Sequence, residues 1–182
     1  MNGKKYAENI SQLALANVDF DMQNRHHISY NLMMIHANTQ SVGDYNGKNS
    51  IFSDDYENLG FTRRQQTNDN MLIVNQLMTN WGLTKSLSLD AGASYNMVKG
   101  YEPDRRINNL TKAEDGYTLL RGNSQQRYFS TLDEDDLNVK AGLVYRLKDN
   151  IEEISNVRFG YTGRFVDDNF KATEYNLSLI HI

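Results

Sequence analysis

The chain has 182 residues, of which 39% are hydrophobic and none is cysteine, and it carries a formal net charge of −4. This charge gives no electrostatic basis for binding nucleic acid, and without cysteine the chain has neither disulfides nor thiolate metal sites. No apolar run reaches the roughly 18 residues that a membrane-spanning helix needs, and the first residues lack the apolar core of a secretory signal. The sequence therefore indicates either an intracellular protein or an internal piece of a longer exported chain.

Apolar and polar residues alternate in six segments, which predicts six β-strands and no convincing helix. The expected strands are residues 10–20, 28–41, 71–81, the first half of 86–106, 137–147 and 156–165. The strand that begins residues 86–106 is the clearest, and its apolar face consists of Leu87, Leu89, Ala91, Ala93, Tyr95 and Met97. A strand of this kind exposes one face to water and places the other against something apolar.

The links between these segments alternate between short and long along the chain. Residues 21–27, 82–85 and 148–155 are short links, whereas residues 42–70 and 99–136 are long and polar. Both long links contain dipeptides that favour turns, namely Asn46-Gly47, Asp115-Gly116 and Gly122-Asn123. The sequence thus predicts an antiparallel meander with short turns at one end and two long loops at the other.

Amphipathic strands with such links are typical of a transmembrane β-barrel, whose outer face is apolar and whose lumen is polar. Four charged residues on the polar faces are predicted to face the lumen: Asp90, Lys140, Arg158 and Arg164. Aromatic residues are expected at the two membrane interfaces, with Phe20, Tyr30, Trp81 and Tyr145 near the short turns and Tyr95 and Phe165 at the other end. The alternative is a soluble antiparallel sandwich, although sandwiches rarely contain two loops of about 30 residues.

Six strands cannot close a barrel, because the smallest barrels have about eight. In a bilayer, each unpaired backbone group at an open edge costs several kcal/mol. Residues 1–182 are therefore predicted to be a partial outer-membrane β-barrel domain without a plug domain, whose remaining strands belong to a longer parent chain. The apolar stretch of residues 176–182 ends abruptly, which also indicates a truncated reading frame.

Three stretches resemble TonB-dependent receptors of the Bacteroidetes type: GASYNMVKGYEPDRR, GNSQQRYFSTLDEDDLNVKAGLVYRL and VRFGYTGRFVDDNF. The shared elements are Ser94-Tyr95 and residues 102–106, 127–130 and 133–136, and the resemblance extends over residues 10–177. It implies an outer-membrane barrel of about 22 strands, closed by an N-terminal plug, that imports a scarce nutrient such as a glycan or a metal chelate.

The resemblance also implies the partners of the parent protein. These are outer-membrane lipid, the remainder of the barrel and the plug, and TonB acting through that plug, while no nucleic acid and no cofactor is expected. The sequence contains no plug-like segment and no recognisable TonB box. Transport is therefore expected of the parent protein in the cell outer membrane, and the chain alone is expected to be inert.

Four charged residues follow the clearest strand: Glu102, Asp104, Arg105 and Arg106. At the start of an external loop, they could capture a ligand at the pore mouth or bind lipopolysaccharide phosphates through the arginines. The favoured interpretation is an internal network of ion pairs, because charges leaving a lumen must be paired or solvated. Arg63-Arg64 in the other long link has the same alternatives. The predicted lumen residues could contact the plug, line a solute path or pair with one another.

Two motifs are candidates for metal binding. His26-His27 lies in a predicted polar turn without further ligands nearby, so a solvated turn is favoured. Residues 133–136 are four consecutive acids that could bind calcium, but they lack the spacing of a calcium loop, and a solvated loop base is favoured.

No arrangement of residues predicts an enzyme. The four histidines have no catalytic spacing with any serine: His26, His27, His36 and His181. Two alternatives to the receptor remain open. One is a structural or adhesive surface β-protein with glycan-binding loops, and the other is an outer-membrane barrel enzyme that acts on lipids.

Overall fold

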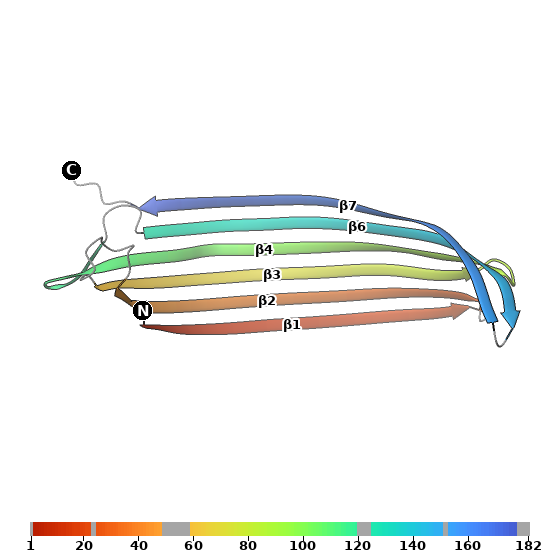
Figure 1. Cartoon of the computed structure of the whole chain (residues 1–182), viewed down its shortest axis with the longest axis horizontal. Coiled ribbons are helices and arrows are strands. Elements are labelled where there is room, and N and C mark those ends of the chain that lie inside the picture. Colours follow the sequence, from red (N-terminus) through yellow and green to blue (C-terminus); the bar gives the residue numbers. More distant parts are fainter. Residues whose placement is uncertain (1, 23–24, 49–58, 120–124, 151–152, 178–182) are drawn as a thin grey trace.

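The computed structural model describes residues 2–22, 25–48, 59–119, 125–150 and 153–177, which form a single antiparallel sheet (Figure 1). Its strands are β1 (Asn2–Met22), β2 (His26–Lys48), β3 (Leu59–Gly82), β4 (Leu87–Ala113), β5 (Gly116–Leu119), β6 (Gln125–Asn150) and β7 (Glu153–Leu177). The six long strands form a meander in the order β1-β2-β3-β4-β6-β7, and the short β5 pairs with β4. The predicted all-β antiparallel meander is confirmed.

The strands are much longer than the alternation predicted. β2 and β3 extend far into residues 42–70, and β4 and β6 extend far into residues 99–136. The prediction of two long loops is therefore wrong over most of these segments, of which residues 49–58 and 120–124 lie outside the described residues. Alternation appears only where one face of a strand is apolar, and a strand that is polar on both faces keeps its backbone pairing without that signal.

One of the three turn signals marks a turn in the described residues. Residues 114–115 connect β4 to β5, and the following Gly116 has a φ of 140°, a conformation that favours glycine. Asn46-Gly47 instead lies within β2, where Gly47 pairs with Gly60 of β3, so the turn predicted there is wrong. Gly122-Asn123 lies outside the described residues.

Strand pairing brings the apolar faces of all six long strands to the same side of the sheet. Directly paired residues place their side chains on one face, so a residue and its partners form a row across the strands. One such row consists of Val18, Tyr30, Leu77, Ala93, Val139 and Gly163. We call this side the apolar face and the opposite side the polar face.

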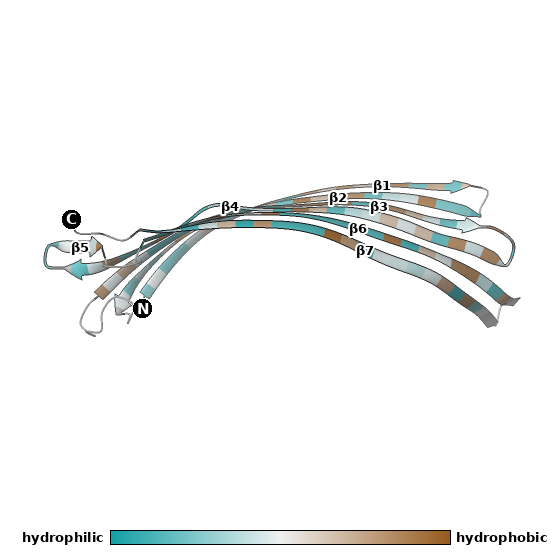
Figure 2. Ribbon diagram, turned by 90° about the horizontal axis from the view of Figure 1, so that it is seen from above, coloured by the Kyte–Doolittle hydropathy of each residue, from teal (hydrophilic) through white to brown (hydrophobic). Residues whose placement is uncertain are grey.

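The apolar face is confined to the half of the sheet that carries the short turns, where hydrophobic residues are frequent in Figure 2. In β1 it extends over residues 14–20, about 23 Å of extended chain. Near its far end, Tyr95, Leu137 and Phe165 lie in one row. Beyond it, a mostly polar row consists of Gln12, His36, Met71, Lys99, Asp133 and Asn169.

The sheet is a single layer, and the described residues contain no hydrophobic core. No large side chain among them is fully buried, and Leu15 and Phe159 are 69% and 81% exposed. The chain exposes 13493 Å² to solvent, whereas a compact protein of its mass exposes about 9,000 Å². Among the six long strands, β1 and β7 each have one unpaired edge, and the described sheet does not close on itself. Both faces and both edges are therefore open to further partners.

Candidate functional sites on the two faces of the sheet

The charged residues expected in an external loop lie inside β4. The loop placement of residues 102–106 is wrong, because β4 continues through them between β3 and β6. The register of β4 against β6 shifts between Glu102 and Arg105, and the register against β3 shifts at the same height. Pro103, the only proline of the chain, lies in this irregularity, where a residue without a backbone N–H is tolerated.

Within the irregularity, Asp104 binds two arginines on the side that continues the apolar face. Arg127 of β6 donates from Nε and Nη2 to the two carboxylate oxygens at 3.1 and 2.8 Å, and Arg106 donates from its Nε. The hydrogen bonds from Arg127 and then Arg106 hold the pKa of Asp104 below its ordinary value. The same carboxylate raises the pKa of Arg127. This geometry is an internal network of ion pairs.

Glu102 and Arg105 lie on the polar face, where Arg105 contacts both Glu102 and a side chain of β6. Arg105 Nε is 3.9 Å from Glu102 Oε1, and its guanidinium carbon is 4.1 Å from the centre of the Tyr128 ring. A guanidinium at this distance from an aromatic face makes a cation–π interaction. Within the described residues, Glu102 Oε1 is buried without a hydrogen-bond partner.

Arg63 and Arg64 were expected in the other long loop, but both lie within β3. Arg63 donates from Nε and Nη2 to the two oxygens of Asp44 at 2.7 and 2.8 Å. This contact lowers the pKa of Asp44 and raises that of Arg63. Arg64 Nη2 donates to Gln66 Oε1 at 3.0 Å. Both arginines therefore bind neighbours within the sheet.

The four predicted lumen residues share the polar face in the half with the short turns. Lys140 Nζ is 3.6 Å from Asp90 Oδ1. Arg164 donates from Nε and Nη2 to the two oxygens of Asp136, both at 3.1 Å, and Asp136 is only 9% exposed. Arg158 pairs in register with Val144 on the same face. Sequence reasoning named Arg164 but not its partner, because the pair is 28 residues apart along the chain.

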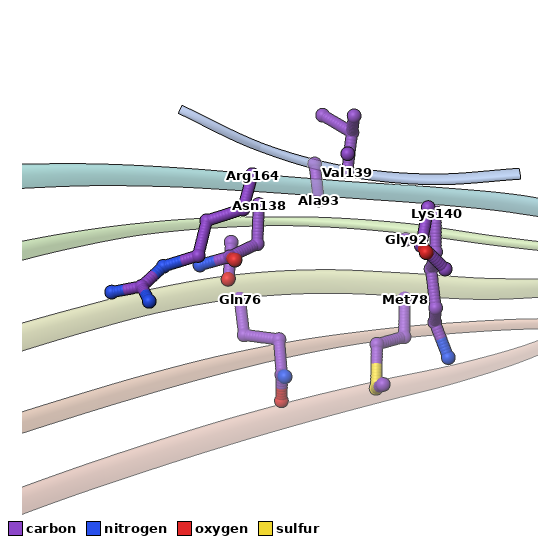
Figure 3. Close-up of a pocket in the computed structure, with 11 residues that line it drawn as sticks. Gln76, Met78, Gly92, Ala93, Asn138, Val139, Lys140 and Arg164 are labelled. Carbon is purple, nitrogen blue, oxygen red and sulfur yellow. The ribbon is translucent and has the colours of Figure 1, made fainter. Parts of the chain in front are cut away.

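A hollow of about 470 Å³ lies on the polar face over β3, β4, β6 and β7. Figure 3 shows the side chains of Gln76, Met78, Asn138 and Lys140 directed to the same side, whereas Val139 points to the opposite side. The side chains that line the hollow are mostly polar and include Ser94, Asn138, Lys140, Thr162 and Arg164.

The histidine and acidic motifs also lie in strands. His26 and His27 are the first two residues of β2. Nδ1 of His27 is 2.8 Å from a carboxylate oxygen of Asp21, and its Nε2 is 3.6 Å from one of Asp19, both in β1. Residues 133–136 lie within β6, so the predicted loop base is wrong. Asp135 accepts a hydrogen bond from the Tyr95 hydroxyl at 2.7 Å. Among the described residues, no three His, Asp or Glu side chains are arranged to hold a metal ion.

One feature of the polar face was missed by sequence reasoning. Its first four strands carry an apolar patch, which we call the inner apolar patch, consisting of Leu13, Leu15, Met33, Ile35, Leu72, Val74 and Val98. The signal was present, because Met33 and Ile35 interrupt the alternation of β2. On β6 and β7 the same rows carry charged residues such as Glu134 and Asp136.

Comparisons with known proteins do not identify the chain. No protein-family model matches it. No curated protein matches it either. Within the described part of the chain, no helix has the length and apolar character needed to cross a membrane.

Proposed function

We propose that the chain is part of the barrel wall of a TonB-dependent outer-membrane receptor that imports a scarce nutrient such as a glycan or a metal chelate. One observation carries the proposal: pairing aligns the apolar faces of six strands into one continuous band on an open, single-layer sheet. Along the strands the band extends over residues 14–20 of β1 and 87–97 of β4, about 23 and 36 Å of extended chain, a range that includes the ~25 Å apolar band of outer-membrane barrels. The sequence resemblance supports the family, and TonB would act through the plug of the parent protein.

The exposed area supports a partner that covers the sheet. The chain exposes about 4,500 Å² more than a compact protein of its mass. Covering the apolar part of this area would be favourable by about 25 cal/mol for each Å² of apolar surface removed from water. Lipid on the apolar face and further strands at the edges of β1 and β7 would supply this cover.

The band is also inclined to the strands, as tilted barrel strands require. It is centred near Asn31 in β2 and near Tyr161 in β7, but the register connects Asn31 with Arg164. The centre therefore moves by about three residues, or ~10 Å, over four strand spacings of ~19 Å in total. The resulting angle of roughly 30° is close to the 35–45° tilt of outer-membrane strands.

The polar half of the sheet would extend beyond the bilayer. About 9–11 residues of a strand suffice to cross a membrane, and β4 has 27 residues. Arg106 lies nine residues beyond Met97, the last residue of the apolar band in β4, which is roughly 30 Å of extended strand. That distance disfavours contact with lipid phosphates at the edge of the band and favours the ion-pair network around Asp104.

Site-directed labelling tests the proposal in the full-length parent protein. The chain has no cysteine, so the variants Leu89→Cys and Ser88→Cys each add one labelling site to it, on opposite faces. After reconstitution into lipid vesicles, a fluorophore at position 89 should be quenched by a lipid-soluble quencher, and one at position 88 by aqueous iodide. Quenching of both by iodide alone would contradict a membrane wall and favour a surface adhesin. A parent gene that encodes no plug domain would contradict the receptor family.

A further inference from the structure

A glycine directly follows an asparagine or an aspartate at three places in the sequence: Asn2-Gly3, Asn46-Gly47 and Asp115-Gly116. In such a pair, the backbone nitrogen of the glycine can attack the side-chain carbonyl carbon of the preceding residue and close a five-membered succinimide ring. Glycine permits the attack because it has no Cβ and a freely adjustable backbone. By sequence alone the asparagines should react first, because a neutral amide is a better electrophile than a carboxylate anion.

The sheet holds both asparagines within paired strands. Asn46 lies inside β2 and pairs with Asn2 of β1 on one side and with Phe61 of β3 on the other. The glycine after Asn2 lies against the ring of Tyr45, whose Cε1 atom would be 2.9 Å from a Cβ at position 3. A peptide paired in this way can reorient for ring closure only after the strands open locally. Pairing on both sides should therefore slow the reaction of Asn46 in the folded protein.

Asp115-Gly116 lies instead at the turn between β4 and β5, at the end of the sheet opposite the short turns (Figure 2). Residues 114 and 115 are exposed and lie outside the strands. Gly116 has a φ of 140°, and nothing lies within 4 Å of the position that its Cβ would occupy. β5 has only four residues, so few pairs with β4 must open before the turn can rearrange.

We propose that Asp115 is a site of spontaneous backbone isomerisation, and that the folded sheet protects Asn46 from the corresponding deamidation. The nitrogen of Gly116 bonds to Cγ of Asp115, and one water leaves, formed from the amide hydrogen and the hydroxyl of the protonated carboxyl group. Water then adds to either carbonyl carbon of the succinimide and opens the ring. The product is aspartate or isoaspartate, with no net change in atoms and no oxidant or reductant. The proposal goes beyond the proposed function and does not rest on it.

Isomerisation at this position would change the outer end of the sheet. In isoaspartate the main chain runs through the former side chain, so the backbone at residue 115 gains one methylene group. The two-residue turn then no longer closes in register, and the pairs from Ala113–Gly116 to Leu110–Leu119 are lost. The ring centres of Tyr117 and Phe61, 5.9 Å apart, would separate as well. A slow covalent reaction thus releases β5 from β4.

The test incubates the folded full-length parent protein at neutral pH and physiological temperature and samples it over weeks. Peptide mapping with fragmentation that separates isoaspartate from aspartate then reads residues 46 and 115. Isoaspartate should accumulate at residue 115, while residue 46 stays mostly asparagine. In protein unfolded in urea the order should reverse, and residue 46 should react at least about tenfold faster than in the folded protein, because a group that reacts only when the strands open is slowed by the rarity of that state.

The matched control is Asp115→Glu, which keeps the charge of the exposed turn but has a side chain too long for the five-membered ring. Aged wild-type protein should lose hydrogen-exchange protection in residues 116–119, and the equally aged variant should keep it. Isoaspartate at residue 115 together with this loss would support the proposal. Folded protein in which residue 46 reacts before residue 115, in which residue 115 stays unchanged, or in which both proteins lose protection equally would overturn it. None of these outcomes depends on whether the parent protein forms a barrel.

Discussion

The two halves of the sheet use the same backbone pairing in opposite chemical settings. In the half with the short turns, one face is apolar in every long strand, and ion pairs such as Asp136–Arg164 lie on the other face. In the extended half both faces are mostly polar, and ion pairs occur on both, as Asp104–Arg127 and Glu102–Arg105 illustrate. The difference teaches that alternation reports the surroundings of a strand, whereas the strand itself is maintained by its hydrogen-bonded neighbours.

The largest difference between the halves should appear when a charge is placed on the apolar side. Under the proposed function, in which the apolar face contacts lipid, Leu143→Arg in the parent protein should lose about 2–4 kcal/mol of unfolding free energy, because the guanidinium would enter the bilayer. Gln40→Arg places the charge on the side that continues the apolar face, but in the extended half. Ser88→Arg places it on the polar face. Both variants should be tolerated. Guanidinium titrations in lipid vesicles measure this, and equal losses for all three variants would contradict the assigned faces.

The next largest effect should come from breaking the Asp136–Arg164 ion pair, in the half with the short turns. Arg164→Leu leaves the carboxylate of Asp136 without its partner, and that side chain is 12% exposed. Arg63→Leu does the same to Asp44, whose side chain is 30% exposed. Because a less solvated charge costs more when unpaired, Arg164→Leu should lower the denaturation midpoint more.

The double variant Asp136→Leu/Arg164→Leu is the control for this comparison. It removes both charges, so it should recover much of the stability that Arg164→Leu loses. Equal midpoints for the Arg164 and Arg63 variants would show that the two pairs are equivalent. A double variant less stable than Arg164→Leu would show that the unpaired carboxylate of Asp136 is not the cause of the loss.

A smaller effect should depend on pH in the extended half. The pKa of Asp104 is lowered by Arg127, so its pairing stabilises the folded protein above the ordinary carboxylate pKa of ~3.9 and is lost as the pH falls through the lowered value. The stability advantage over Asp104→Asn should be constant above about pH 5 and decline in more acidic solution. Urea midpoints between neutral and acidic pH measure it. An advantage already lost near pH 6 would contradict the lowered pKa, and Arg127→Gln should reduce the pH-dependent part.

The smallest effect should be that of salt on the stability contributed by the exposed Asp44–Arg63 ion pair, which also lies in the extended half. Arg63→Gln should slightly destabilise the parent protein at low ionic strength, and the difference should shrink at 1 M salt, where the Debye length is ~3 Å. Thermal denaturation at two salt concentrations measures it. A difference that grows with salt would show that Arg63 acts through packing, for example against Phe61, whose ring centre is 5.6 Å from its guanidinium.

The predictable part of the fold was the half in which alternation is informative. All six long strands and the face of each were predicted there, because every second side chain in a strand faces the same way. The extended half was mistaken for loops, since polar residues on both faces leave no period and since Asn46-Gly47 resembles a turn.

The candidate sites were predictable only as single residues. Asp90, Lys140, Arg158 and Arg164 were placed on the polar side from local alternation, but the bidentate contact of Arg164 with Asp136 depends on the pairing of β6 with β7. The hollow was not predictable at all, because its lining comes from four strands.

By itself, the sequence determined that this chain forms amphipathic strands, because side-chain alternation is a local property of extended backbone. It also determined which residues of each strand are apolar. Only the tertiary structure decided the register, which aligns those residues into one inclined band and places Tyr95, Leu137 and Phe165 in one row. The same register joins Asp104 to Arg127, since contacts between residues far apart in the chain depend on how strands pair and where a bulge shifts them.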